Sequence, residues 1–152
     1  MRDLLTVLSD LKQYVQLAEK QHHGVSVVNI GWHIEHSLLV VTKIIGSLCD
    51  SNPSNYRPRF NLVRTLIFFR DRFPRGRGKA PDEVKPKGGH PIDFDRLFSK
   101  AEIAVGRLAT AHPNQYFEHP LFGSLNRKNT YILLDIHTRH HLNIIRDILS
   151  AA

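Results

Sequence analysis

The segment NRKNTYILLDIHTRHHLNIIRDILS, residues 126–150, is a long helical pattern that contains neither proline nor glycine. At about 100° per residue its apolar side chains fall in one stripe roughly 100° wide, the width of a helix face that packs on a core. The stripe consists of Leu134, His137, His141, Ile144, Ile145 and Ile148. Two imidazoles one helical turn apart are therefore expected inside the protein.

Two buried imidazoles cost free energy unless each of them finds a partner. Residues at positions i and i+4 are neighbours on a helix face, so one metal ion could bind both His137 and His141. The alternative is a pair of core histidines that form hydrogen bonds with other protein groups. On the same helical wheel His140 lies outside the stripe, and Asp135 lies farther round and points away from the pair.

The remaining chain shows three more amphipathic segments of helical length and one shorter segment. They cover residues 3–22, a helix that Ser26 caps and that ends near Cys49, a short helix at 59–73, and residues 94–112 after the cap residue Asp93. No strand-like alternation of useful length is present. The pattern predicts an all-α fold, a four-helix bundle in one domain spanning 1–152. The short helix and the basic loop 74–91 form its long crossover.

A histidine pair on one helix needs a third ligand from a facing helix to form a stable open metal site. His33 is the best candidate because it lies at the edge of the apolar stripe of its helix, and the small side chain of Ser37 leaves room beside it. His36 lies farther from the stripe and is expected to be solvated or to lie behind the ligands. Three neutral imidazoles leave a coordination position for water, as in catalytic zinc sites. Imidazole also suits nickel, iron and copper, so the ion is not identified.

The formal net charge of +7 comes from one part of the chain. Residues 57–87 contain ten Lys or Arg and three Asp or Glu, and the remainder is balanced. A localised basic segment favours an anionic small ligand or a solvated loop over a nucleic-acid groove. Arg75, Arg77 and Lys79 are candidate contacts for an anionic substrate. DNA binding through this segment is the weaker alternative, because no nucleic-acid motif accompanies it.

Cysteine content and hydropathy exclude several other classes of protein. The single cysteine, Cys49, excludes an intramolecular disulfide and a multi-cysteine zinc site. The N-terminal segment carries charges within its apolar run, unlike a signal peptide. No apolar stretch is long enough to span a bilayer. We therefore expect a cytoplasmic protein without a membrane partner.

Three pieces of the chain resemble the DinB/YfiT-like superfamily of metal-dependent proteins. SVVNIGWHIEHS, residues 26–37, resembles the motif of its second helix, in which a histidine precedes an aliphatic residue, here His33 and Ile34. HPLFGSLNRKNTYILLDIHTRHHL, residues 119–142, resembles the C-terminal motif of a DinB-like subfamily of unassigned function, an HPxFG turn before a helix with HxxHH. FPRGRGKAPDEVKP, residues 73–86, resembles the crossover of that subfamily.

The resemblance implies a bundle with a histidine triad at one end, often in a homodimer. The three residues that bind a divalent ion such as zinc, nickel or iron in this family correspond, by the resemblance, to His33, His137 and His141. Relatives often carry a glutamine soon after HxxHH, a position that this chain does not reproduce, although Asn143 could serve in its place.

Characterised relatives include thiol-cofactor S-transferases and a maleylpyruvate isomerase. The resemblance therefore implies a metal-dependent transferase or hydrolase that acts on a small molecule, such as a low-molecular-weight thiol. Glu118 and His119 could approach the metal from the rim, or they could serve only to cap and pack their turn. The alternative function is a non-catalytic metal-binding dimer in which the ion stabilises the fold or is sensed.

Overall fold

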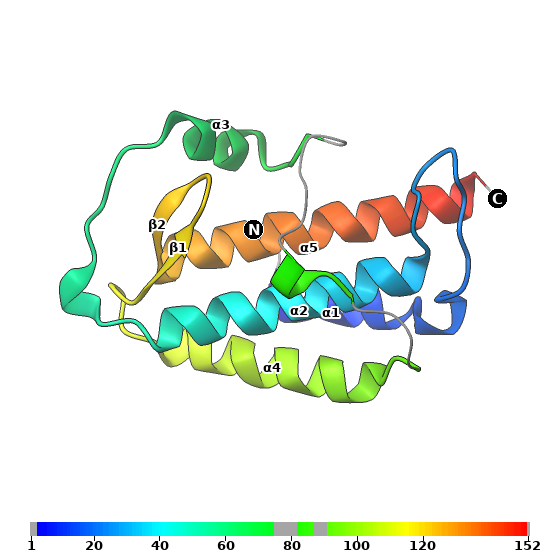
Figure 1. Cartoon of the computed structure of the whole chain (residues 1–152), viewed down its shortest axis with the longest axis horizontal. Coiled ribbons are helices and arrows are strands. Elements are labelled where there is room, and N and C mark those ends of the chain that lie inside the picture. The colour runs from blue at the N-terminus through cyan, green and yellow to red at the C-terminus, as the bar shows by residue number, and fades with distance from the viewer. Residues whose placement is uncertain (1–2, 75–81, 87–90, 152) are drawn as a thin grey trace.

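The computed structural model describes residues 3–74, 82–86 and 91–151 and is mostly helical (Figure 1). Its elements within these ranges are α1 (Leu4–Lys12), α2 (Ile30–Cys49), α3 (Leu62–Arg70), α4 (Phe94–Thr110), β1 (Tyr116–His119), β2 (Gly123–Asn126) and α5 (Arg127–Ser150). Short 3-10 turns lie at Val15–Leu17, Pro53–Asn55 and Asp82–Val84. The predicted helical character is confirmed, but the fold is mostly helical rather than all-α, because it includes the two strands of a hairpin.

The packing of α1, α2, α4 and α5 is consistent with a bundle. α2 packs on α4 and on α5, and α1 packs on the same two helices, as Figure 1 shows with α1 behind α2. The core between them is built from buried leucine, isoleucine, valine and alanine side chains of all four helices together with Phe98. α3 stands apart, beside the β1–β2 hairpin and the first half of α5. None of the helices in the described ranges has the length and apolar character needed to cross a membrane.

Each α-helix begins at an asparagine or aspartate whose side chain accepts a hydrogen bond from a backbone N–H of the first turn. These cap residues are Asp3, Asn29, Asn61, Asp93 and Asn126. Such caps satisfy amide donors that have no partner inside the helix. Asp93 is the predicted cap. For α2, however, the predicted cap Ser26 is wrong, because the helix begins three residues later, behind Asn29.

The first helix is shorter than predicted, because the chain after Lys12 turns back toward the start of α2. The carbonyl of Ala18 accepts a hydrogen bond from the N–H of Gly31 at 2.8 Å, and that of Lys20 accepts from Ile30 at 2.9 Å. A side chain at Gly31 would approach Ala18 to 3.2 Å, so glycine permits this close approach. The segment between α1 and α2 is thus fixed against the N-terminal end of α2.

The turn predicted before the last helix contains a hairpin that the sequence pattern does not predict. Tyr116 pairs with Asn126, and His119 pairs with Gly123, which adopts φ +69° at the tight turn between the strands. Each strand has four residues, which is too short for a clear alternation of polar and apolar positions. The hairpin packs Phe122 and Leu125 on Leu133 of α5 in a second, smaller core.

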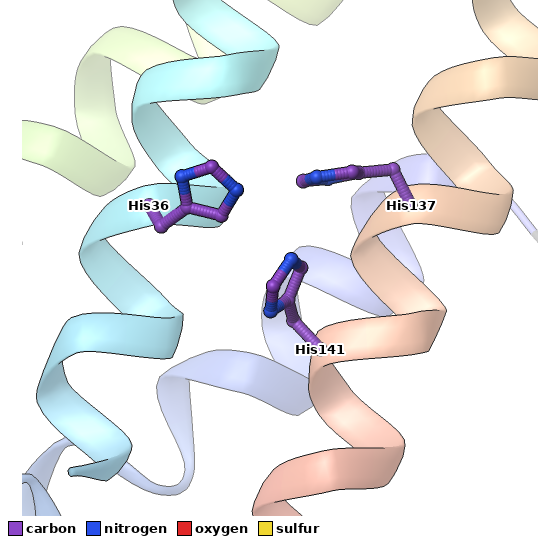
Figure 2. A group of neighbouring side chains, drawn as sticks. All are labelled: His36, His137 and His141. Carbon is purple, nitrogen blue, oxygen red and sulfur yellow. The ribbon is translucent and has the colours of Figure 1, made fainter. Parts of the chain in front are cut away.

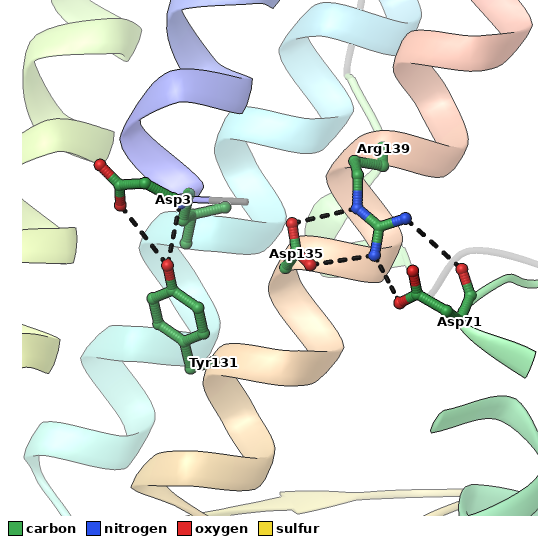
Figure 3. Close-up of polar contacts among 6 residues, drawn as sticks. Asp3, Asp71, Tyr131, Asp135 and Arg139 are labelled. Atoms are coloured by element: carbon green, nitrogen blue, oxygen red, sulfur yellow. Dashed lines mark hydrogen bonds and ion pairs between the residues drawn. The ribbon is translucent and has the colours of Figure 1, made fainter. Parts of the chain in front are cut away.

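Asp135 of α5 is linked to the end of α3 through the side chain of Arg139 (Figure 3). Its carboxylate, 2% exposed, accepts hydrogen bonds from Nε of Arg139 at 3.1 Å and from Nη2 at 2.9 Å. The same Nη2 donates to the carboxylate of Asp71 at 2.6 Å. Asp71 ends α3 in the left-handed conformation at φ 51°, which aspartate tolerates better than most residues.

Removal of this buried carboxylate is expected to destabilise the protein strongly. Asp135→Ala leaves the guanidinium of Arg139 only partly compensated, and breaking a buried ion pair in this way costs about 3 kcal/mol of unfolding free energy. Asp71→Asn is the matched control: its carboxylate is 64% exposed, so the loss should be below about 1 kcal/mol. Urea unfolding of both variants measures the difference. Equal losses would show that burial of Asp135 does not set the strength of this contact.

Candidate metal centre

Three histidine side chains from two helices point into the same space between α2 and α5 (Figure 2). They are His36 from α2 and His137 and His141 from α5, and each can offer one ring nitrogen so that all three nitrogens lie within 4.8 Å of one another. The ring centroids lie 4.6 Å apart for His137 and His141, and 4.8 Å apart for His36 and His141. This cluster of three imidazoles could hold a metal ion.

The spacing of the nitrogens fits such an ion after small movements of the side chains. Metal–nitrogen bonds of about 2.0–2.1 Å in a tetrahedral site place the nitrogens roughly 3.3 Å apart. The widest pair of the cluster, at up to 4.8 Å, must therefore close by about 1.5 Å on binding. Rotations about the side-chain torsions of histidine can supply this change without movement of the helices.

His36 is held by a contact from the crossover. Its Nδ1 lies 2.7 Å from the carbonyl of Val84, an acceptor only, so Nδ1 carries the proton and Nε2 has its lone pair free. Metal-binding histidines commonly use their second nitrogen in this way, which fixes the tautomer and the ring orientation. The indole of Trp32 stacks on the same ring, with centroids 4.8 Å apart.

The expectation that His36 is solvated is wrong, since its side chain is only 3% exposed. The helical wheel assumed a single buried stripe on α2. In the structure α2 packs on α4, on α5, on β1 and on the turn Asp82–Val84, so that eleven of its residues are buried around most of its circumference. One signal in the sequence could have indicated this: residues 38–41 are all apolar, which is typical of a helix buried on several sides.

His33, the predicted third ligand, is also buried, at 4% exposure, but it lies one turn before His36 and is not a member of the converging group. Its Nδ1 lies 2.9 Å from Nδ1 of His141, and its Nε2 lies 3.0 Å from the hydroxyl of Ser26. Of the three predicted ligands, the cluster therefore contains His137 and His141, with His36 in the third place.

His137 carries the clearest indication that the cluster is incomplete by itself. Its Nδ1 is buried and has no hydrogen-bond partner among the described residues. A buried polar atom without a partner costs about 1–3 kcal/mol. A cation bound to this nitrogen would remove that cost, which is the fit expected of a metal ligand.

Burial keeps the four histidines of this region neutral. Desolvation, and then the neighbouring His36 and His140, lower the pKa of His33 to about 4. Desolvation and the surrounding histidines hold the pKa of His137 and of His141 well below its usual value. Desolvation also lowers the pKa of His36, although its hydrogen bond to Val84 opposes the shift. Neutral imidazole is the form that binds metal ions.

The other candidate residues lie on the β1–β2 hairpin or outside the described ranges. His119 is near enough to His137 to contribute to the lowering of its pKa. The carboxylate of Glu118 accepts a hydrogen bond from the hydroxyl of Ser124 across the hairpin. His119 accepts backbone hydrogen bonds from residues 121 and 122 and stacks on Phe122, so both side chains have roles within the turn. The candidate substrate contacts Arg75, Arg77 and Lys79 lie outside the described residues.

Comparison of the chain with known protein families, with curated proteins and with solved structures gave no match. The resemblance to the DinB/YfiT-like superfamily therefore stays a prediction from the motifs. The cluster itself depends only on the geometry of the histidines.

Proposed function

We propose that His36, His137 and His141 bind one divalent transition-metal ion and that the protein is a metal-dependent enzyme. The observation that carries this proposal is the set of three neutral imidazoles with a buried, unpartnered nitrogen on His137. The group has three members among the described residues, which leaves at least one coordination position for water or substrate. Open sites of three protein ligands are typical of catalytic rather than structural zinc.

The ion would supply Lewis acidity and would lower the pKa of a coordinated water or thiol. Among the residues that the structure describes, no carboxylate belongs to the converging group. Asp135 is engaged by Arg139, and Glu35 lines a separate cleft beside Trp32. The residues of the chain keep the three imidazoles neutral and orient their rings. Packing around the site excludes most water. This division of roles favours hydrolysis or transfer of a thiol to a small molecule over chemistry that needs a separate general base.

Several finer features are part of the same proposal. The bundle would be DinB-like and homodimeric, the substrate would be a small molecule such as a low-molecular-weight thiol, and Arg75, Arg77 and Lys79 would contact its anionic groups. Imidazole ligands fit zinc, nickel or iron. The motifs of the second helix and of residues 119–142 support these features.

Metal titration tests the proposal directly. We expect purified, metal-free protein to bind one equivalent of Zn²⁺ or Co²⁺, measured by calorimetry and by elemental analysis after gel filtration. Co²⁺ should give visible absorption bands that change when an exogenous thiol is added, because an open position can accept it. The single tryptophan, Trp32, stacks on His36 and should report binding through its fluorescence. Absence of stoichiometric binding would overturn the proposal.

A structural ion is the second candidate function, and chelation distinguishes it. The apolar core of α1, α2, α4 and α5 forms without any contribution from the three histidines. We therefore expect the chelated protein to stay folded and to lose only the ligand-linked stability, about 3 kcal/mol at a hundredfold excess of ion over Kd. Loss of helical circular dichroism on chelation would instead indicate a structural ion.

A further inference from the structure

We infer that His33 is a positioning residue for the metal centre: together with Ser26 it forms a hydrogen-bond relay that turns the Nε2 lone pair of His141 toward the cluster. This inference rests on the proposed function for the metal itself. The relay of Ser26, His33 and His141 is a property of the chain with or without the ion. It also gives a role to a buried histidine that the cluster does not use.

The relay consists of two contacts in series. Nδ1 of His33 lies 2.9 Å from Nδ1 of His141, and Nε2 of His33 lies 3.0 Å from Oγ of Ser26. Between two neutral imidazoles an N–H···N hydrogen bond needs one proton, since two protonated nitrogens would repel each other and two lone pairs would not bond. The tautomers of His33 and His141 are therefore coupled: a proton on one Nδ1 excludes a proton on the other.

Metal binding selects one of the two arrangements. With Nδ1 of His141 engaged by His33, its Nε2 is the nitrogen that remains for the cluster. A lone pair on this Nε2 requires the proton on Nδ1, which then donates to His33. His33 in turn must carry its proton on Nε2, where it donates to the hydroxyl of Ser26. Every nitrogen of the two rings is satisfied in this arrangement, as is usual for the outer partners of metal-binding histidines.

The loop that carries Ser26 is itself fixed. The N–H of Ser26 donates to the carbonyl of His22 at 3.0 Å, and its hydroxyl accepts from the N–H of Val28 at 3.2 Å. The hydroxyl can accept a second bond, from His33, and keeps its own proton. Together with the hydrogen bonds of Ile30 and Gly31 to the preceding segment, these contacts hold the hydroxyl of Ser26 beside Nε2 of His33.

The first test uses the metal-free protein and is independent of any ion. In ¹⁵N NMR spectra we expect a scalar coupling across the hydrogen bond between Nδ1 of His33 and Nδ1 of His141. Zn²⁺ should preserve this coupling and place both rings in the stated tautomers, His141 protonated at Nδ1 and His33 at Nε2. Absence of the coupling in the metal-free protein would overturn the relay, whether or not the protein binds zinc. Loss of the coupling on addition of Zn²⁺ would also overturn it, because His33 would then be a ligand.

The second test compares variants by their affinity for Zn²⁺. His33→Phe keeps a buried ring without an acceptor and should weaken binding by about 10–100-fold, as for other outer partners of metal-binding histidines. His33→Asn places an amide oxygen near the position of Nδ1 and should restore most of the affinity. Ser26→Ala leaves the ring in place and should cost less than His33→Phe.

The affinities of these variants show whether the positioning role of His33 fails or whether the proposed metal binding fails. Equal losses in His33→Phe and His33→Asn, as large as the loss in His141→Ala, would identify His33 as a ligand and overturn its positioning role. Wild-type affinity in His33→Phe would overturn the relay as well. If the wild-type protein binds no Zn²⁺, the proposed function fails, and the NMR coupling alone decides the relay.

Discussion

Alanine in place of His36, His137 or His141 is expected to abolish stoichiometric binding of Zn²⁺. Each change removes one of three imidazoles that converge within 4.8 Å, and two remaining ligands do not define an open three-coordinate site. The loss of affinity should exceed the roughly 100-fold that accompanies removal of an outer partner. Competition with a chromophoric chelator measures the affinity, and elemental analysis measures the bound metal.

The variants also decide which histidine of α2 is the third ligand. His36→Ala should lose the metal, whereas His33→Ala should retain a weakened site. His23→Ala is a suitable control, since His23 is exposed and its ring lies beside Gln21, away from the metal centre. A full loss in His33→Ala with normal binding in His36→Ala would restore the ligand set that the sequence predicts. Circular dichroism should show that all variants keep their helices.

The second half of the last helix could be predicted from its sequence because only one side of it is buried. Leu134, His141, Ile145 and Ile148 are buried as their spacing requires, and Asn126 caps the helix. The period of 3.6 residues identifies such a face whenever the opposite side meets water. The pair His137 and His141 therefore emerged from periodicity alone.

The buried residues of α2 could not be predicted as well, because this helix is covered on several sides. A helical wheel ranks residues by their distance from one stripe, and this ranking loses meaning when two helices, a hairpin strand and a crossover turn contact the same helix. The carbonyl of Val84, 48 residues away in the chain, is what holds His36. No local pattern indicates that contact.

Asp135 illustrates the same limit on α5. Its place outside the histidine stripe was predicted correctly, but its burial was not. Arg139 lies four residues later on the same helix, where helix geometry alone brings it to Asp135, whereas Asp71 of α3 reaches the same guanidinium only in the tertiary structure. A charged residue on a polar face is normally solvated. Only the position of α3 on this side of α5 shows that Asp135 is buried.

Acidification is expected to destabilise the metal-free protein between about pH 6.5 and pH 4. The folded state holds the pKa of His33 and of His119 at about 4, and that of His137 and His141 well below its usual value. Well above pH 6.5 these imidazoles are neutral in both folded and unfolded chains, so their protonation does not affect stability. As the pH falls, the unfolded chain takes up protons that the folded chain rejects, and the free energy of unfolding decreases.

The size of this effect should be large for a domain of this length. A pKa lowered from 6.5 to about 4 corresponds to about 3 kcal/mol for His33 alone, and the other buried histidines add to it. Since typical domains have only about 5–15 kcal/mol of stability, we expect acid unfolding before pH 4 is reached. Urea unfolding at a series of pH values, followed by Trp32 fluorescence and circular dichroism, measures the slope.

Removal of one buried histidine tests the origin of the acid transition. His33→Phe should reduce the slope of unfolding free energy against pH between pH 6.5 and pH 5, where few carboxyl groups titrate. The reduction should reach up to about 1.4 kcal/mol per pH unit, the slope that corresponds to one proton. Saturating Zn²⁺ should shift the transition to lower pH, because the ion binds only the neutral rings of the folded protein. A stability that stays constant or rises on acidification in this range would mean that the rings are protonated in the folded protein. The cluster would then be cationic and unsuited to hold a metal ion.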